Sequence, residues 1–262
     1  MKQALTTTDA PVGCSTVPVR TYRSTEPSPW TIVFAHGGGF SWGTLDDYDQ
    51  ICRNMCLATG AELVSIDYRL APKYPFPCGL DDVCSVVREV TSTVGAGRMV
   101  AVAGDSAGGC LAAGAAQRLL AEEITNIAAQ LLIYPMIEYY DRTPSAFHTL
   151  SDRFHPSYAA VRNAWDTYLQ SPVDRLPSYA VPPRAPSLAG LPPAMTIVAE
   201  NDPLRFEAIA YAQQLAAAGV TSQIRACEGT AHGFLNEPAH GSAAKALADI
   251  SGFLSSVQSG AT

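Results

Sequence analysis

Charged side chains are scarce in this sequence. Asp, Glu, Lys and Arg make up 16% of the 262 residues, whereas about a quarter is usual. This excludes a coiled coil and a charge-driven disordered chain. The 17 basic residues form no cluster and are outnumbered by 24 acidic ones, for a net charge of −7. We therefore expect no nucleic-acid partner and no attraction to anionic membranes.

Long hydrophobic runs are also missing. No apolar run reaches the roughly 18 residues that cross a bilayer, so we predict no integral membrane span. Residues 1–7 contain no apolar signal core, which predicts no export and a cytoplasmic protein. The seven cysteines are an odd number without metal-type spacing. Cys52 and Cys56 lie one helical turn apart without histidine companions, so we expect reduced thiols and no metal site.

What the sequence does contain is a repeated order of strand, glycine-rich turn and helix. Several expected strands are continuous apolar runs, such as residues 99–103, which is typical of strands buried on both faces of a parallel sheet. This alternation predicts one α/β domain over residues 1–262, a mostly parallel central sheet with helices on both faces. The expected strands are 16–22, 31–35, 62–67, 98–103, 128–134, 194–199 and 222–227. The expected helices are 46–58, 79–94, 107–121, 206–218 and 242–256.

One long stretch, residues 137–193, breaks this order. It shows no strand pattern and is rich in aromatic residues and prolines. An insertion of this length inside a compact domain is commonly functional, so we predict a helical cap or lid. The alternative is additional packing for a sheet edge.

The sharpest motif is Gly-Asp-Ser-Ala-Gly-Gly at residues 104–109. It follows a buried strand and opens a helix, which is the context that a Gly-x-Ser-x-Gly nucleophile turn requires. The glycines are needed because Cβ atoms two positions on either side of Ser106 would collide with the neighbouring strand and helix. The turn would place the Ser106 hydroxyl above the sheet at a helix N-terminus. Ser106 is therefore the candidate nucleophile.

A second glycine motif, His36-Gly37-Gly38-Gly39-Phe40, follows another apolar strand. Consecutive glycines expose backbone N–H groups and can supply an oxyanion hole. Phosphate binding is less well supported, because no lysine follows and the GxGxxG spacing is absent. We expect His36 to orient this loop rather than to act as a base.

A serine nucleophile needs a base and a carboxylate that orients it. His232 follows the last expected strand, at the sheet edge where Ser106 projects, and is favoured as the base. Asp202 follows the strand 194–199 and is the candidate carboxylate; it could instead cap the next helix, and Glu200 is the fallback. The remaining histidines are less suitable, since two lie in the aromatic insertion and one begins an expected surface helix: His148, His155 and His240.

With these motifs the chain resembles the α/β-hydrolases of the hormone-sensitive-lipase-like family of bacterial carboxylesterases. The matching segments run in family order between residues 16 and 257: 36–40, 67–72, 104–109, 134–135, 190–193, 202–205 and 232–234. The resemblance implies Ser106 as nucleophile, His232 as base and Asp202 as its orienting partner. It also implies an oxyanion hole formed by the N–H groups of Gly38, Gly39 and Ala107.

The chain departs from the family pattern at several places. Lys73, Phe206 and Cys110 stand where the family usually has Glu, Asp and often Asn, which affects local salt bridges rather than the chemistry. Family members also carry several dozen residues before the strand matching 17–22, whereas about 15 precede it here. We therefore expect the N-terminal part of the cap to be absent or trimmed, which would leave the entrance open to bulky esters.

The resemblance further implies hydrolysis of short- to medium-chain uncharged esters without a cofactor, and a possible homodimer. The residues expected to contact the small-molecule ester are Phe40, Asp105, Tyr139 and Trp165. Two other classes of protein remain open. One is another serine acyl hydrolase, such as an amidase or lactonase, because pocket shape decides leaving-group preference. The other is a ligand-binding protein on the same scaffold, against which the presence of His232 argues.

Overall fold

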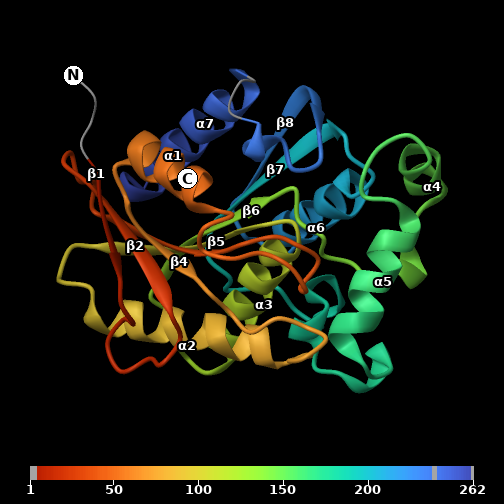
Figure 1. Cartoon of the computed structure of the whole chain (residues 1–262), viewed down its shortest axis with the longest axis horizontal. Helices are drawn as coiled ribbons and strands as arrows, with labels where there is room; N and C mark the ends of the chain where they lie inside the picture. Colours follow the sequence, from red (N-terminus) through yellow and green to blue (C-terminus); the bar gives the residue numbers. More distant parts are fainter. Residues whose placement is uncertain (1–4, 238–240, 261–262) are drawn as a thin grey trace.

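The computed structural model describes residues 5–237 and 241–260. In these residues eight strands form one sheet in the order β1-β2-β4-β3-β5-β6-β7-β8 (Figure 1). The strands from β3 to β8 run parallel, and β1 and β2 are antiparallel to their neighbours. The strand bounds are β1 (Leu5–Asp9), β2 (Val19–Ser24), β3 (Trp30–Ala35), β4 (Glu62–Ile66), β5 (Met99–Asp105), β6 (Ile127–Ile133), β7 (Ala194–Asn201) and β8 (Ser222–Ala231).

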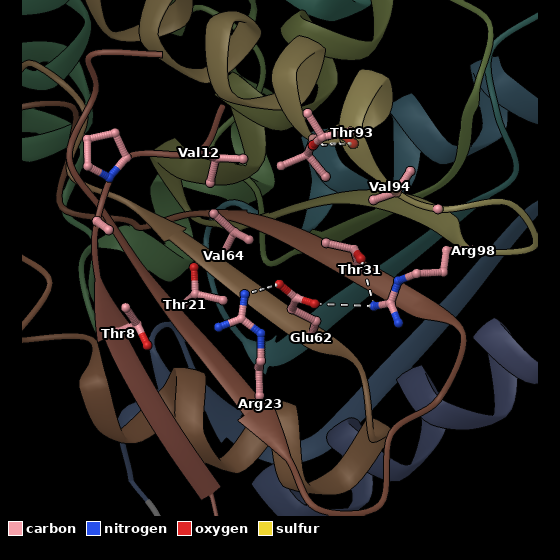
Figure 2. Close-up of a pocket in the computed structure, with 14 residues that line it drawn as sticks. Thr8, Val12, Thr21, Arg23, Thr31, Glu62, Val64, Thr93, Val94 and Arg98 are labelled. Atoms are coloured by element: carbon pink, nitrogen blue, oxygen red, sulfur yellow. Dashed lines mark hydrogen bonds and ion pairs between the residues drawn. The ribbon is translucent and has the colours of Figure 1, made fainter. Parts of the chain in front are cut away.

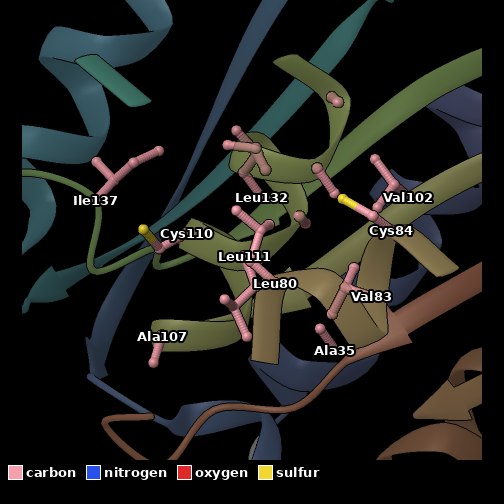
Figure 3. Packing of buried hydrophobic residues seen from close by; sticks show 14 of the residues in the cluster. Ala35, Leu80, Val83, Cys84, Val102, Ala107, Cys110, Leu111, Leu132 and Ile137 are labelled. Carbon is pink, nitrogen blue, oxygen red and sulfur yellow. The ribbon is translucent and has the colours of Figure 1, made fainter. Parts of the chain in front are cut away.

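Helices cover both faces of this sheet. One face packs against α1 (Asp49–Thr59) and α7 (Gly241–Gln258), and the other against α2 (Cys78–Thr93), α3 (Ala107–Ala121) and α6 (Arg205–Ala217) (Figure 1). Ile32 and Phe34 of β3 face the first layer, while Val33 and Ala35 face the second. Figure 3 shows this second core, in which side chains from α2, α3 and the sheet interlock. The prediction from continuous apolar strands is confirmed.

Three strands differ most from the sequence prediction, and one of them is β8, which runs to Ala231, four residues beyond the expected end at 227. β1 was not expected, because its residues Leu-Thr-Thr-Thr-Asp are mostly exposed and lack apolar alternation; β1 is held by antiparallel pairing with β2 at the sheet edge. β2 begins at Val19 rather than at residue 16, after Pro18, which has no N–H to donate to a neighbouring strand. The five helices expected outside the insertion are confirmed within about three residues, although His240 lies outside the described residues.

Between β6 and β7, residues 137–193 contain no strand. They form α4 (Ser145–Ser151), α5 (Tyr158–Leu169) and four short 3-10 helices, η1 (Tyr140–Arg142), η2 (Val173–Arg175), η3 (Ser178–Ala180) and η4 (Pro182–Arg184). Tyr168 of α5 stacks on Phe40 with ring centroids 3.9 Å apart, and its carbonyl accepts the Phe76 N–H at 2.8 Å. Aromatic packing thus fixes α5 to the loops that follow β3 and β4.

A hollow of about 350 Å³ lies at the amino ends of β3 and β4, beside the C-terminus of α2. Arg23 and Arg98 approach Glu62 from either side, at 2.8 and 3.5 Å (Figure 2). Arg98 also donates to the Thr31 hydroxyl at 2.9 Å. The charges of this hollow are therefore paired with one another.

In the described part of the chain, no helix has both the length and the apolar character to span a bilayer.

Candidate active site

Ser106 occupies a sharp turn between β5 and α3. Its backbone has φ +53° and ψ −122°, a left-handed region that side chains rarely adopt. A Cβ on Gly104 would overlap the carbonyl of Gly108, and one on Gly108 would overlap the carbonyl of Ala35. The predicted steric reason for the glycines is therefore confirmed. Ser106 also donates its N–H to the Ile133 carbonyl at 2.9 Å, which ties the turn to β6.

His232 lies between Ser106 and Asp202. Its Nδ1 is 2.7 Å from Asp202 Oδ2, and its Nε2 is 2.9 Å from Ser106 Oγ. A carboxylate can only accept, so Nδ1 carries the proton and Nε2 is free to accept the proton of the Ser106 hydroxyl. Three residues from the ends of β5, β7 and β8 are thus joined in one line of hydrogen bonds.

Asp202 is fully buried and serves two partners. Oδ2 accepts from His232, while Oδ1 accepts the N–H of Leu204 at 2.9 Å, just before α6. Asp202 is therefore the partner of His232, whereas the alternative reading as a helix cap is not supported, because the N-cap of α6 is Leu204 and receives no side-chain capping bond. The fallback carboxylate Glu200 instead accepts the N–H of Gly229 at 2.7 Å.

Electrostatics favour protonation of His232. Burial disfavours the charged imidazolium, but the charge and hydrogen bond of Asp202 and the charge of Asp105 outweigh it, so the pKa of His232 is raised. An imidazole held in this way takes a proton more readily than a free one.

The glycine loop after β3 lies beside Ser106. Gly38 and Gly39 have φ of +103° and +57°. The described residues offer no hydrogen-bond acceptor to the N–H groups of Gly38, Gly39 or Ala107, the last being the first residue of α3. Unpaired N–H groups at a loop and a helix N-terminus suit a developing negative charge.

Asp105 and His36 hold this loop in place. The Asp105 carboxylate accepts the N–H of Gly37 at 2.7 Å. Burial raises the pKa of Asp105 to about 6, although the Gly37 bond and the charge of His232 oppose the rise. His36 Nδ1 donates to the Gly37 carbonyl at 2.7 Å, and its ring stacks on Tyr68. These contacts agree with the expected loop-orienting role of His36.

A cleft of about 320 Å³ opens at Ser106. Its lining is mostly apolar or backbone: Gly38, Gly39, Trp42, Tyr48, Asp105, Ser106, Met136, Pro156, Ala160, Val161, Ala164, His232, Gly233 and Asn236. Of the four residues expected to contact substrate, Asp105 lines the cleft.

The other three expected contacts, Phe40, Tyr139 and Trp165, are not among the residues that line the cleft. Phe40 and Trp165 are buried against each other and against Tyr168. Tyr139 packs on Tyr140. The aromatic side chains of α5 thus pack against Phe40 and its neighbours, whereas Ala160, Val161 and Ala164 of α5 line the cleft.

Sequence reasoning missed Trp42, Met136 and the small side chains of α5. The one sequence signal that could have placed any of them at the cleft was the position of Trp42, three residues after Gly39. As for metals, the residues described include no group of three or more His, Cys, Asp or Glu side chains arranged to hold an ion.

Comparisons with known proteins point in one direction. Residues 32–236 match the family model described as alpha/beta hydrolase fold. The chain is 39% identical to esterase LipI of Mycobacterium tuberculosis over 78% of this chain, and spans 65% of the length of LipI. It is 32% identical to an ethyl acetate hydrolase of Pseudomonas putida, covering 88% of this chain and 74% of the relative.

Solved structures agree. The thermostable carboxylesterase EstE1, cloned from a metagenomic library, superposes with a TM-score of 0.88 at 30% identity, covering 99% of this chain and 91% of EstE1. An esterase of Pyrobaculum calidifontis gives a TM-score of 0.87 at 32% identity, covering 98% and 86%.

Proposed function

This chain belongs to the alpha/beta hydrolase fold family and, within it, to the hormone-sensitive-lipase-like carboxylesterases, and from that premise we propose that it hydrolyses carboxylic esters through an acyl-enzyme on Ser106. The observation that carries the proposal is the unbroken line of hydrogen bonds from Ser106 through His232 to buried Asp202. This arrangement supports the proposal, because it lets Asp202 hold the Nδ1 proton of His232 while Nε2 accepts the proton of Ser106.

In the first half of the reaction, Ser106 Oγ attacks the ester carbonyl carbon while His232 Nε2 takes the hydroxyl proton. The carbonyl oxygen becomes an oxyanion, which accepts hydrogen bonds from the N–H groups of Gly38, Gly39 and Ala107. Loss of one such donor typically costs about 3 kcal/mol of barrier. The imidazolium then protonates the leaving alcohol, and Ser106 carries the acyl group.

In the second half, His232 takes a proton from water, which attacks the acyl carbon through a second oxyanion. The proton returns to Ser106 Oγ as the carboxylic acid leaves. Asp202 keeps Nδ1 protonated and stabilises the transient imidazolium. The chemistry uses side chains and backbone alone.

The cleft supports small uncharged substrates. Met136, Pro156 and Val161 give it apolar walls, and about 320 Å³ is near the lower end of small-molecule sites. We propose short- to medium-chain acyl esters as substrates, with residues 137–193 acting as the cap over them. The seven cysteines are free, which fits the reducing cytoplasm that we propose as the location.

The test replaces the nucleophile. Ser106→Ala should lower kcat for p-nitrophenyl butyrate by at least about 10⁴-fold, since loss of one triad member disables the whole unit. Circular dichroism should show an unchanged fold. Ser92→Ala, an exposed serine at the far end of α2, is the matched control and should retain wild-type turnover.

Substantial activity in Ser106→Ala would refute the nucleophile assignment. The same wild-type enzyme is then offered ethyl butyrate, butyramide and a butyrolactone. We expect the ester to be hydrolysed fastest; a faster amide or lactone would replace the carboxylesterase proposal with an amidase or a lactonase.

A further inference from the structure

Trp42 is unusual for its exposure. Among the described residues it is the one large hydrophobic side chain that is exposed, at 59%, and it lines the cleft that contains Ser106. A single apolar side chain on a protein surface needs no explanation in itself. An exposed indole that lines the cleft of the proposed nucleophile is different, because it offers apolar surface to a bound substrate.

Trp42 belongs to the same rigid loop as the proposed oxyanion donors. Its N–H donates to the Gly38 carbonyl at 3.0 Å. A Cβ on Gly38 would overlap the Trp42 backbone carbonyl and lie 3.3 Å from an indole carbon, so the ring packs directly over the Gly38 backbone. Tyr48 flanks the indole, with ring centroids 6.5 Å apart. The indole is therefore packed against the loop that carries the proposed oxyanion donors and lines the same cleft as Ser106.

The cap contributes small residues to the same cleft. Pro156, Ala160 and Ala164 line it, and their short side chains leave room for a ring. A flat substituent there can contact the indole, gaining dispersion and the quadrupole preference that aromatic pairs show. A saturated ring of similar size is thicker and lacks this preference.

We propose that Trp42 is a specificity-determining residue that makes the enzyme prefer esters carrying a planar aromatic group next to the ester bond. The inference rests on the proposed ester hydrolysis and specifies its substrate class. The shared chemistry is the aromatic ring, which can belong to the acid or to the alcohol, and the experiment distinguishes the two.

The test uses two matched substrate pairs, each comparing a benzene ring with a cyclohexane ring. Ethyl phenylacetate and ethyl cyclohexylacetate vary the acid; benzyl acetate and cyclohexylmethyl acetate vary the alcohol. Acid release is followed by pH-stat, so no aromatic reporter is needed. Wild type should favour the aromatic member of at least one pair in kcat/KM by about 2- to 10-fold, the range of one aromatic contact.

Three variants then locate the preference. Trp42→Leu should bring the aromatic-to-saturated ratio close to one, and Trp42→Phe should restore part of it. Tyr74→Leu removes a partly exposed aromatic ring outside the cleft and should leave the ratio unchanged. The pair that responds identifies the side of the ester that meets the indole.

Two results would overturn the inference. If wild type hydrolyses ethyl butyrate but shows the same ratios as Trp42→Leu in both pairs, Trp42 does not select substrates, while ester hydrolysis stands. If wild type hydrolyses no ester, ethyl butyrate included, the proposed function fails and the inference fails with it.

Discussion

Two hollows of similar size lie at opposite ends of the same parallel strands. The one at the carboxyl ends, near Ser106, has about 320 Å³, and the one at the amino ends, near Glu62, has about 350 Å³. In the first, a serine is held at positive φ and N–H groups lack protein partners among the described residues. In the second, two guanidinium groups are paired with one carboxylate.

The difference teaches that volume does not identify a reactive site in this molecule. The amino-end hollow has charges, but its carboxylate is already paired with both guanidinium groups. The carboxyl-end cleft contains the Ser106 hydroxyl bonded to His232 and N–H groups without protein partners among the described residues, and we propose that a substrate completes their hydrogen bonds. Chain topology explains the asymmetry, because loops that leave the carboxyl ends of parallel strands converge above the sheet.

The largest expected effect at the carboxyl end comes from Asp202→Asn. The amide keeps the shape and can still accept the Leu204 N–H through Oδ1, but it offers His232 an N–H instead of a charge. kcat should fall by about 10⁴-fold, because the imidazole adopts the wrong tautomer. Initial-rate assays with p-nitrophenyl butyrate would measure kcat, and a thermal melt would show that the variant is folded.

Glu200→Gln is the matched control, since Glu200 is the neighbouring carboxylate that does not contact the imidazole. It should keep near-wild-type turnover. The opposite pattern, with Glu200→Gln inactive and Asp202→Asn active, would transfer the orienting role to Glu200.

A smaller effect is expected in the pH profile. kcat/KM rises with pH as His232 loses its proton, and the raised pKa of His232 places the midpoint above the usual histidine pKa of about 6.5. Asp105→Asn removes a negative charge that favours the imidazolium, so the midpoint should move to lower pH. The asparagine oxygen can still accept the Gly37 N–H, which limits the loss of kcat.

Asp174→Asn, an exposed aspartate on η2, controls for the change in net charge and should not move the midpoint. A midpoint that stays in place, or rises, in Asp105→Asn would show that Asp105 does not act on His232.

The smallest effect is expected at the amino end. Glu62→Gln leaves Arg23 and Arg98 facing each other without the carboxylate, and partly exposed ion pairs contribute at most about 1 kcal/mol each. Urea unfolding should show a slightly lower midpoint, while kcat/KM for ethyl butyrate stays at the wild-type value. A clear loss of activity without unfolding would make the amino-end hollow functional and erase the contrast.

Much of the fold was readable from the sequence because parallel strands carry strong local signals. The apolar run at 99–103 predicts a strand, and the glycine turn after it predicts the start of a helix at Ala107. The edge strand β1 was missed because its stability comes from pairing with β2 and not from burial. The internal packing of residues 137–193 was also unreadable, since aromatic content does not reveal which neighbours each ring will meet.

The site shows the same division. Ser106, Asp202 and His232 follow strands whose ends must meet, so their proximity was predictable. The sequence could not predict which face of α5 borders the cleft. Trp165 and Tyr168 turn toward Phe40, and Ala160 and Ala164 toward Ser106, because the large rings fill the interior more completely than alanine does.

The contrast between Trp42 and the other two tryptophans also supplies an optical probe. Trp30 and Trp165 are buried, at 2% and 0% exposure. A water-soluble collisional quencher therefore reaches Trp42 selectively, and the red edge of the emission spectrum reports on the mouth of the cleft. Occupancy of the catalytic pocket can be followed by intrinsic fluorescence, without a label and without turnover.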